Sequence, residues 1–133
     1  MDTFNLADVF VVLTPDKAAE TVKNTPTMFE ELDSTYGDFK HHELIALFEF
    51  QEDWPSWEIH PNGDEVVVLL SGSATFVVKL DDDKREVRLS RPGDSVIVPR
   101  GAWHTARIDV PTKLLFITPG EGTLNEFDKT RFG

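Results

Sequence analysis

Residues 57–72, WEIHPNGDEVVVLLSG, contain two strand-like runs separated by a tight turn. Side chains alternate between the two faces of a strand, so Glu58 and His60 point the same way. The turn residues 61–64 let the chain reverse, which returns Glu65 to about the level of His60 on the next strand. Three side chains of the kinds that bind metal ions are therefore expected on one part of a β-sheet.

A second stretch, residues 93–104, reads GDSVIVPRGAWH and adds a fourth side chain of this kind. His104 follows a tight turn at 99–101 and could come from a neighbouring strand to complete a set of two imidazoles and two carboxylates. A single His or Glu in a β protein is more often a surface residue than a ligand. The metal-site prediction depends on the joint spacing of the four.

Short strand-like runs alternate with turn signals from residue 39 to residue 124. About eight such strands at this spacing predict an all-β antiparallel sandwich or barrel. The runs are Leu44–Phe50, Trp57–His60, Glu65–Leu70, Ala74–Leu80, Glu86–Leu89, Ser95–Val98, His104–Ile108 and Leu114–Thr118.

The N-terminal segment is the least barrel-like part of the chain. Val9–Leu13 is β-branched and aromatic, which predicts a first strand. Asp16–Asn24 and Met28–Asp33 are rich in helix formers, and Pro26 separates them into two short helical pieces. We expect one domain overall, made of an N-terminal segment that covers the barrel (1–36), the barrel itself (37–124) and a C-terminal tail (125–133).

Charge and composition narrow the classes of partner. The 133 residues carry 13 Lys and Arg against 24 Asp and Glu, a formal net charge of -11, which disfavours nucleic acid and anionic membrane surfaces. With no cysteine, disulfides and thiol catalysis are excluded, and no G-x-S-x-G motif suggests a serine nucleophile. The apolar run Val9–Leu13 is too short for a signal core or a membrane span, so a cytoplasmic location is expected.

The joint spacing of these residues resembles the two motifs of the cupin superfamily. In the first motif, Glu58-Ile59-His60 occupies the place of H-x-H, four residues lead to Glu65, and six more lead to Gly72. The fixed positions of the second motif up to its His are occupied by Gly93, Pro99, Gly101 and His104. The resemblance implies an antiparallel jelly-roll barrel, also called a double-stranded β-helix, with a short N-terminal strand and helical segment.

The sequence departs from the usual motifs at three positions. Glu52 stands where the first motif opens with Gly, Glu58 stands where that motif has its first His, and Ile108 stands where the second motif ends in Asn. In the family, the two His and the Glu of the first motif and the His of the second bind a divalent metal. The resemblance therefore implies His60, Glu65 and His104 as metal ligands, with Glu58 as a substituted fourth.

The Glu at position 58 affects the expected metal and the expected chemistry. A second carboxylate adds a harder, negatively charged donor, which favours Mn²⁺ or Fe²⁺ over Cu²⁺ or Ni²⁺ and still permits Zn²⁺. If Glu58 does not bind the metal, it becomes a candidate catalytic base whose pKa burial would raise. The alternative is a barrel that has lost its metal, with Glu58 hydrogen-bonded to His60 or His104.

Two functions follow from this interpretation. The first is a metal-dependent enzyme of the isomerase, lyase or oxygenase type that acts on a small polar molecule. The second is a non-catalytic module that binds a small ligand. Arg100 could bind a substrate carboxylate, although exposed arginines in turns usually do not. The outer face of the strands is apolar, so the N-terminal segment or a second subunit is expected to cover it. The resemblance favours a homodimer.

Overall fold

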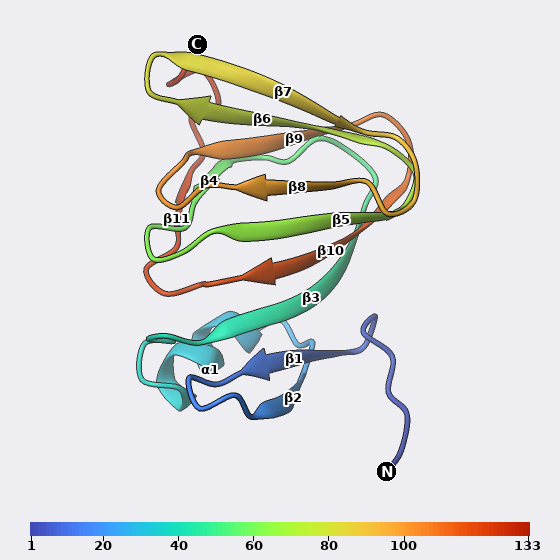
Figure 1. The fold of residues 1–133 in the computed structure, drawn as a ribbon, viewed down its shortest axis with the longest axis vertical. Coiled ribbons are helices and arrows are strands. Elements are labelled where there is room, and N and C mark those ends of the chain that lie inside the picture. Colours follow the sequence, from blue (N-terminus) through green and yellow to red (C-terminus); the bar gives the residue numbers. More distant parts are fainter.

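The computed structural model describes residues 1–133 as two antiparallel sheets that face each other (Figure 1). The six-stranded sheet runs in the order β2 (Ala19–Lys23), β1 (Val9–Leu13), β3 (Glu43–Phe50), β10 (Thr112–Thr118), β5 (Glu65–Ser71) and β8 (Ser95–Val98). The five-stranded sheet runs in the order β11 (Leu124–Glu126), β4 (Trp57–Ile59), β9 (His104–Ile108), β6 (Ala74–Leu80) and β7 (Asp83–Leu89). The predicted all-β jelly-roll barrel is confirmed.

The main core lies between the two sheets. Strand alternation turns every second apolar side chain inward, so that buried and partly exposed residues alternate along β5 and β10. Val67, Leu69, Phe76 and Leu114 are fully buried at its centre. The strands that carry the first motif are therefore held in place by the main core.

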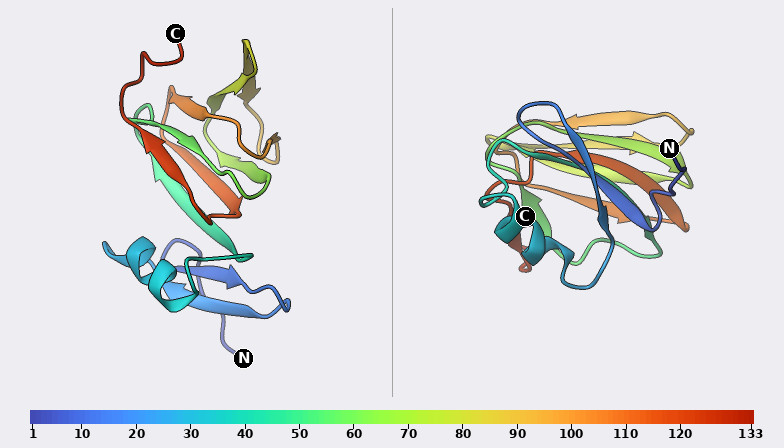
Figure 2. Two further views of the ribbon diagram at one scale, coloured as in Figure 1. Left: turned by 90° about the vertical axis from the view of Figure 1, so that its left-hand side faces the viewer. Right: turned by 90° about the horizontal axis from the view of Figure 1, so that it is seen from below.

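The N-terminal residues form a separate part of the molecule at the lower end of Figure 1 and of the left view in Figure 2. The hairpin of β1 and β2 extends the six-stranded sheet beyond β3, and the helix α1 (Met28–Thr35) packs against it. A second core cluster fills the space between them. Its buried members are Phe10, Val12, Met28, Leu32, Phe39, Leu44 and Ala46. The eight-residue α1 is too short to cross a lipid bilayer.

One predicted element is wrong. The sequence predicts helix over Asp16–Asn24, whereas residues 19–23 form the strand β2, paired with β1 in the register Phe10↔Val22. A left-handed residue, Lys17 at φ 73°, makes the turn between the two strands. Pairing with β1 therefore outweighs a weak helix propensity here, since Thr21 and Val22 are β-branched and suit a strand. The second helical piece, Met28–Asp33, lies within α1.

The C-terminal tail is docked on the outside of the five-stranded sheet. β11 pairs with β4, and the ring of Phe132 packs against Trp57 with a centroid separation of 5.2 Å. The indole nitrogen of Trp57 donates to the Lys129 carbonyl at 3.1 Å. Trp57 therefore faces away from the interior, as its alternation with Glu58 predicts.

Candidate metal centre

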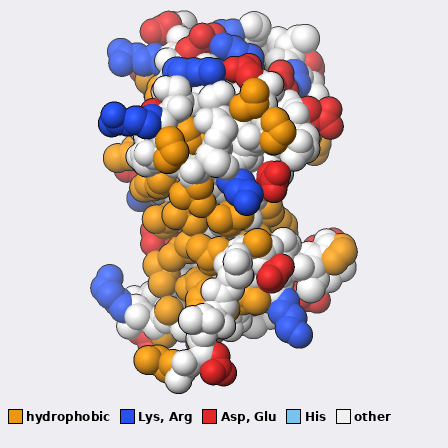
Figure 3. Space-filling view, turned by 90° about the vertical axis from the view of Figure 1, so that its right-hand side faces the viewer, with side chains coloured by type: hydrophobic (Ala, Val, Ile, Leu, Met, Phe, Trp, Pro, Cys, Tyr) orange, Lys and Arg blue, Asp and Glu red, His pale blue; other side chains and the backbone are white.

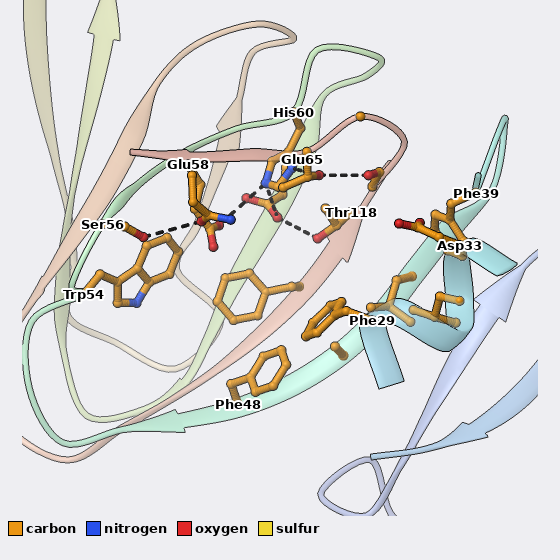
Figure 4. Close-up of a pocket in the computed structure, with 18 of the residues that line it drawn as sticks. Phe29, Asp33, Phe39, Phe48, Trp54, Ser56, Glu58, His60, Glu65 and Thr118 are labelled. Carbon is orange, nitrogen blue, oxygen red and sulfur yellow. Dashed lines mark hydrogen bonds and ion pairs between the residues drawn. The ribbon is translucent and has the colours of Figure 1, made fainter. Parts of the chain in front are cut away.

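The strand register brings the four predicted metal-site residues together. Glu58 in β4 lies directly opposite His104 in β9, which places their side chains as neighbours on one face of the five-stranded sheet. His60 follows β4 immediately, and Glu65 is the first residue of β5 in the facing sheet. We call these four residues the donor cluster. Figure 4 shows Glu58, His60 and Glu65 converging at one end of a cavity.

Distances within the donor cluster are close to those between ligands of a single ion. Ligand atoms about 2.1 Å from one ion lie about 3.0 Å apart at right angles and about 3.4 Å apart in a tetrahedron. The two Glu65 oxygens lie 3.2 Å from His60 Nε2 and 3.3 Å from His104 Nε2. Glu58 Oε2 lies farther away, 3.8 Å from His60 Nε2 and 4.0 Å from His104 Nε2. Glu58, His60 and His104 each offer one ligand atom within 4.8 Å of the others.

Hydrogen bonds on the outer side of both imidazoles determine which nitrogen faces the centre. His104 Nδ1 lies 3.1 Å from the Ala102 carbonyl, which can only accept, so Nδ1 carries the proton. His60 Nδ1 lies 2.8 Å from the Thr123 hydroxyl, which donates its own proton to the Gly120 carbonyl at 2.9 Å. Nδ1 of His60 is therefore the donor in that pair as well. Each Nε2 presents a lone pair to the centre, the arrangement that metal-binding histidines require.

The inward-facing atoms of the donor cluster have no other partner. Nε2 of His60, Nε2 of His104 and Oε1 of Glu65 are buried and make no hydrogen bond. Buried polar atoms are rarely left unpaired, and an unpaired group costs about 1–3 kcal/mol. Two lone pairs beside two carboxylates suit a cation, and imidazole nitrogens with carboxylate oxygens are a donor set for Mn, Fe or Zn. The residues present therefore fit a divalent metal ion.

The charges in the cluster shift three pKa values. Burial would raise the pKa of Glu65, but contacts with His104 and His60 outweigh it and lower that pKa to about 2. Burial would lower the pKa of His104, but the neighbouring Glu65 carboxylate outweighs it and raises that pKa. Burial raises the pKa of Glu58, although His104 acts in the opposite direction. Glu65 is thus held ionised, whereas Glu58 is the carboxylate that takes up a proton more readily.

The donor cluster opens into a cavity of about 690 Å³, a size typical of small-ligand sites. Aromatic rings from β3, β10 and α1 continue the cavity from the donor cluster toward the N-terminal part (Figure 4). Its lining comprises Phe29, Leu32, Asp33, Asp38, Phe39, Leu44, Ala46, Phe48, Phe50, Trp54, Pro55, Ser56, Glu58, His60, Glu65, Phe116, Thr118, Gly120, Gly122, Thr123, Asn125 and Phe127. Arg100 is exposed and does not line the cavity.

Two threonines of the site were not identified from the sequence. Thr123 fixes His60, and the Thr118 hydroxyl donates to Glu65 Oε2 at 2.6 Å. Neither stands at a motif position, and no spacing signal points to them. The general expectation that a metal-binding side chain has an outer hydrogen-bond partner predicts that such residues exist but does not say which they are.

Comparisons with known proteins identify relatives of the barrel. The model of the cupin domain family matches residues 46–118. Acireductone dioxygenase from two strains of Rhodopseudomonas palustris is 27% identical to this chain over 100 residues, which are 68% of this chain and 59% of that protein. The chain thus matches less than two thirds of the length of these relatives.

Solved structures resemble the same part of the chain. Oxalate decarboxylase from Bacillus subtilis superposes with a TM-score of 0.54 and 24% identity, covering 62% of this chain and 23% of the other. An oxalate oxidase superposes with a TM-score of 0.52 and 18% identity, covering 62% of this chain and 45% of the other. At these identities the likeness shows a shared fold.

Proposed function

The chain belongs to the cupin domain family, and we propose that it holds a divalent metal ion in its barrel and oxygenates a small organic molecule. One observation carries this proposal. Two buried imidazoles, each fixed by a hydrogen bond at Nδ1, present Nε2 lone pairs beside two carboxylates, and these inward-facing nitrogens have no other partner. Two histidines with a carboxylate and open positions are the donor set of non-haem iron oxygenases. The 27% identity to acireductone dioxygenase supports the same reaction class.

We assign separate roles to the residues of the donor cluster. His60, Glu65 and His104 are buried and would hold the ion, with Thr123 and Thr118 orienting the first two. The two carboxylates favour Mn²⁺ or Fe²⁺, and Zn²⁺ remains compatible. A bound ion of this kind supplies a Lewis acid and, in the case of iron, a redox centre.

Glu58 is the residue with two candidate roles. Its oxygen lies 3.8–4.0 Å from the two Nε2 atoms, so a small side-chain rotation would bring it to the ion as a fourth ligand. Its side chain is 32% exposed and lines the cavity, and burial raises its pKa, so it could instead accept a proton from a substrate. Glu58→Ala and Glu58→His separate the roles. A ligand role predicts that alanine loses metal and histidine keeps it, whereas a base role predicts that both keep metal and lose activity.

Metal content and oxygen consumption test the whole proposal. Protein purified without chelator should contain about one Mn or Fe per chain, or take it up, and His104→Ala should abolish uptake. Oxygen uptake with a substrate panel then distinguishes an oxygenase from an isomerase or lyase. No metal on purification, and none recovered with Mn²⁺, Fe²⁺ or Zn²⁺, would refute the metal site. Ligand binding without turnover of any panel member would favour the non-catalytic binding module.

We also propose that a second copy of this chain covers the outer face of the six-stranded sheet. The register aligns one apolar residue from each of five strands in a continuous row: Val11, Ile45, Ile117, Val66 and Ile97. The next row contains Leu47, Leu115 and Val68. Neither row carries a charge, and Figure 3 shows hydrophobic side chains across the middle of one face, with most charged side chains toward the two ends.

An apolar face of this kind suits a homodimer better than other partners. Permanent homodimer interfaces are more apolar than ordinary protein surface, and an apolar sheet face is complementary to itself across a two-fold axis. A net charge of -11 disfavours anionic lipid as the occupant. Light scattering should give twice the chain mass of 15.0 kDa for the wild type and a smaller mass for Ile97→Glu. Val110→Glu, at an exposed position outside these rows, is the control and should leave the dimer intact. A monomeric wild type would refute the proposal.

A further inference from the structure

The walls of the cavity carry negative charges and no Lys or Arg side chain. Glu58 and Glu65 lie at the donor-cluster end, and Asp33 and Asp38 lie at the end formed by the N-terminal part. Figure 4 shows Asp33 beside Phe29 and Phe39, away from Glu58 and Glu65. Neither Asp33 nor Asp38 forms an ion pair with Lys or Arg. A ligand in this cavity therefore meets uncompensated carboxylates at the distal end.

The donor-cluster end marks the cavity as a ligand site independently of these distal aspartates. Glu65 is only 2% exposed, and its Oε1 has no hydrogen-bond partner. A divalent ion there would neutralise the formal charge of Glu58 and Glu65. The two negative charges of Asp33 and Asp38 would remain. Both side chains are exposed, so water screens them from the ion, and they act chiefly on a charged group that lies beside them.

Aromatic rings form the wall between the two ends. Phe48 lies at the centre of this wall, with its ring centroid 5.9 Å from that of Phe116 and 6.5 Å from that of Phe29, to which it is nearly parallel. Phe29 is 59% exposed and stands at the cavity mouth. A flat organic ring would contact these faces, while a small dicarboxylate would leave most of the 690 Å³ unfilled.

On the basis of the proposed metal site, we propose that the substrate is an aromatic molecule with a chelating head group and with an uncharged or cationic tail. The head group binds at the donor cluster, the ring lies against Phe48 and Phe29, and the tail reaches Asp33 and Asp38. A tail that carries a carboxylate meets two like charges and no basic side chain, so it is rejected.

Three catechols, each with a two-carbon side chain of different charge, test this assignment. They are dopamine (cationic), 4-ethylcatechol (neutral) and 3,4-dihydroxyphenylacetate (anionic). Calorimetry on Zn²⁺-loaded protein without oxygen avoids turnover and oxidation. Dopamine should bind about tenfold or more tighter than 3,4-dihydroxyphenylacetate, with 4-ethylcatechol between them. Oxalate should bind more weakly than any of the three.

Matched variants test the source of the preference. Asp33→Asn combined with Asp38→Asn should bring the three affinities together, whereas Asp82→Asn, on an exposed hairpin outside the cavity, should leave their order unchanged. Phe29→Ala should weaken all three catechols by a similar factor because it removes an exposed ring face and no charge.

Failure of this inference is distinguishable from failure of the metal site. If the protein binds Zn²⁺ but binds 3,4-dihydroxyphenylacetate as tightly as dopamine, the inference is refuted and the metal site stands. If none of Mn²⁺, Fe²⁺ and Zn²⁺ binds, the metal site is refuted, and the same three ligands are compared in metal-free protein. The same order is expected there because Asp33 and Asp38 are unchanged, and equal affinities would refute the inference.

Discussion

The orientation of His60 depends on Thr123, and the substitution Thr123→Val tests this dependence. The valine has nearly the same shape as threonine but cannot accept the proton of His60 Nδ1, which lies 2.8 Å from the threonine hydroxyl. His60 is 5% exposed, so water has little access to replace the lost acceptor. Without that acceptor the imidazole loses its preference for the tautomer with a free Nε2 lone pair.

The expected loss follows from the cost of removing the outer partner of a metal-binding histidine. Such changes typically weaken metal affinity about 10–100-fold, or about 1.4–2.7 kcal/mol. We expect a value toward the upper end because the site is buried. Competition with a fluorescent chelator for Mn²⁺ or Zn²⁺ measures it directly.

The matched control is Thr123→Ser, which keeps the hydroxyl and should stay within about threefold of the wild-type affinity. Circular dichroism should show both variants folded, since Thr123 lies outside the two core clusters. A folded Thr123→Val protein with wild-type metal affinity would show that the hydroxyl does not orient His60, and the proposed arrangement of the donor cluster would be wrong.

Four further predictions follow from the site, the core and one turn. The Glu65 carboxylate raises the pKa of His104, so protons compete with metal for this imidazole and metal affinity should increase with pH until His104 is deprotonated. Chelator competition at a series of pH values measures this, and an affinity that does not change with pH would contradict it. In metal-free protein, the Glu65–His104 ion pair should contribute most to the free energy of unfolding between pH 4.5 and 6.5, the ordinary pKa values of Glu and His, as urea unfolding in the presence of chelator would measure. That contribution should fall as pH rises through the raised pKa of His104, and also as pH drops toward about 2, the pKa of Glu65. Leu114→Ala, at a fully buried position, should reduce the free energy of unfolding by about 2–5 kcal/mol, and a loss below about 1 kcal/mol would contradict the assigned core. Gly72→Ala should also destabilise the fold in urea, because φ is 83° and a Cβ would lie 2.4 Å from the Pro111 carbonyl oxygen; unchanged stability would show that this turn can shift.

Local rules predicted the barrel and the convergence of the donor cluster. Alternation along β4 placed Glu58 and His60 on one face, and the short turn after it returned the chain to Glu65. These inferences involve residues close in sequence, where geometry leaves few alternatives. The spacing of the second motif added His104 through a resemblance to a known family, since local geometry alone does not determine which strand lies beside β4.

Features that depend on distant parts of the chain were not predictable in the same way. β2 forms a strand because β1 lies beside it, and its own sequence favours helix about as well. Thr123 reaches His60 across 63 positions, and Asp33 reaches the cavity only because α1 packs beside β3. The expectation of a small polar substrate rested on the donor residues alone, which carry no information about the aromatic side chains that line the rest of the cavity.

The two ends of the cavity come from parts of the chain that relate differently to other cupins. All four residues of the donor cluster fall within residues 46–118, the part that matches the family model, whereas Phe29, Asp33 and Phe39 precede it. Similarity to relatives can therefore inform the metal chemistry but carries little information about the end of the cavity that Asp33 and Asp38 line. If the tail of the substrate contacts Asp33 and Asp38, exchanging both for neutral residues should remove the preference among the three catechols while metal affinity stays constant. Selectivity that instead followed substitutions in the donor cluster would place substrate choice within the shared barrel.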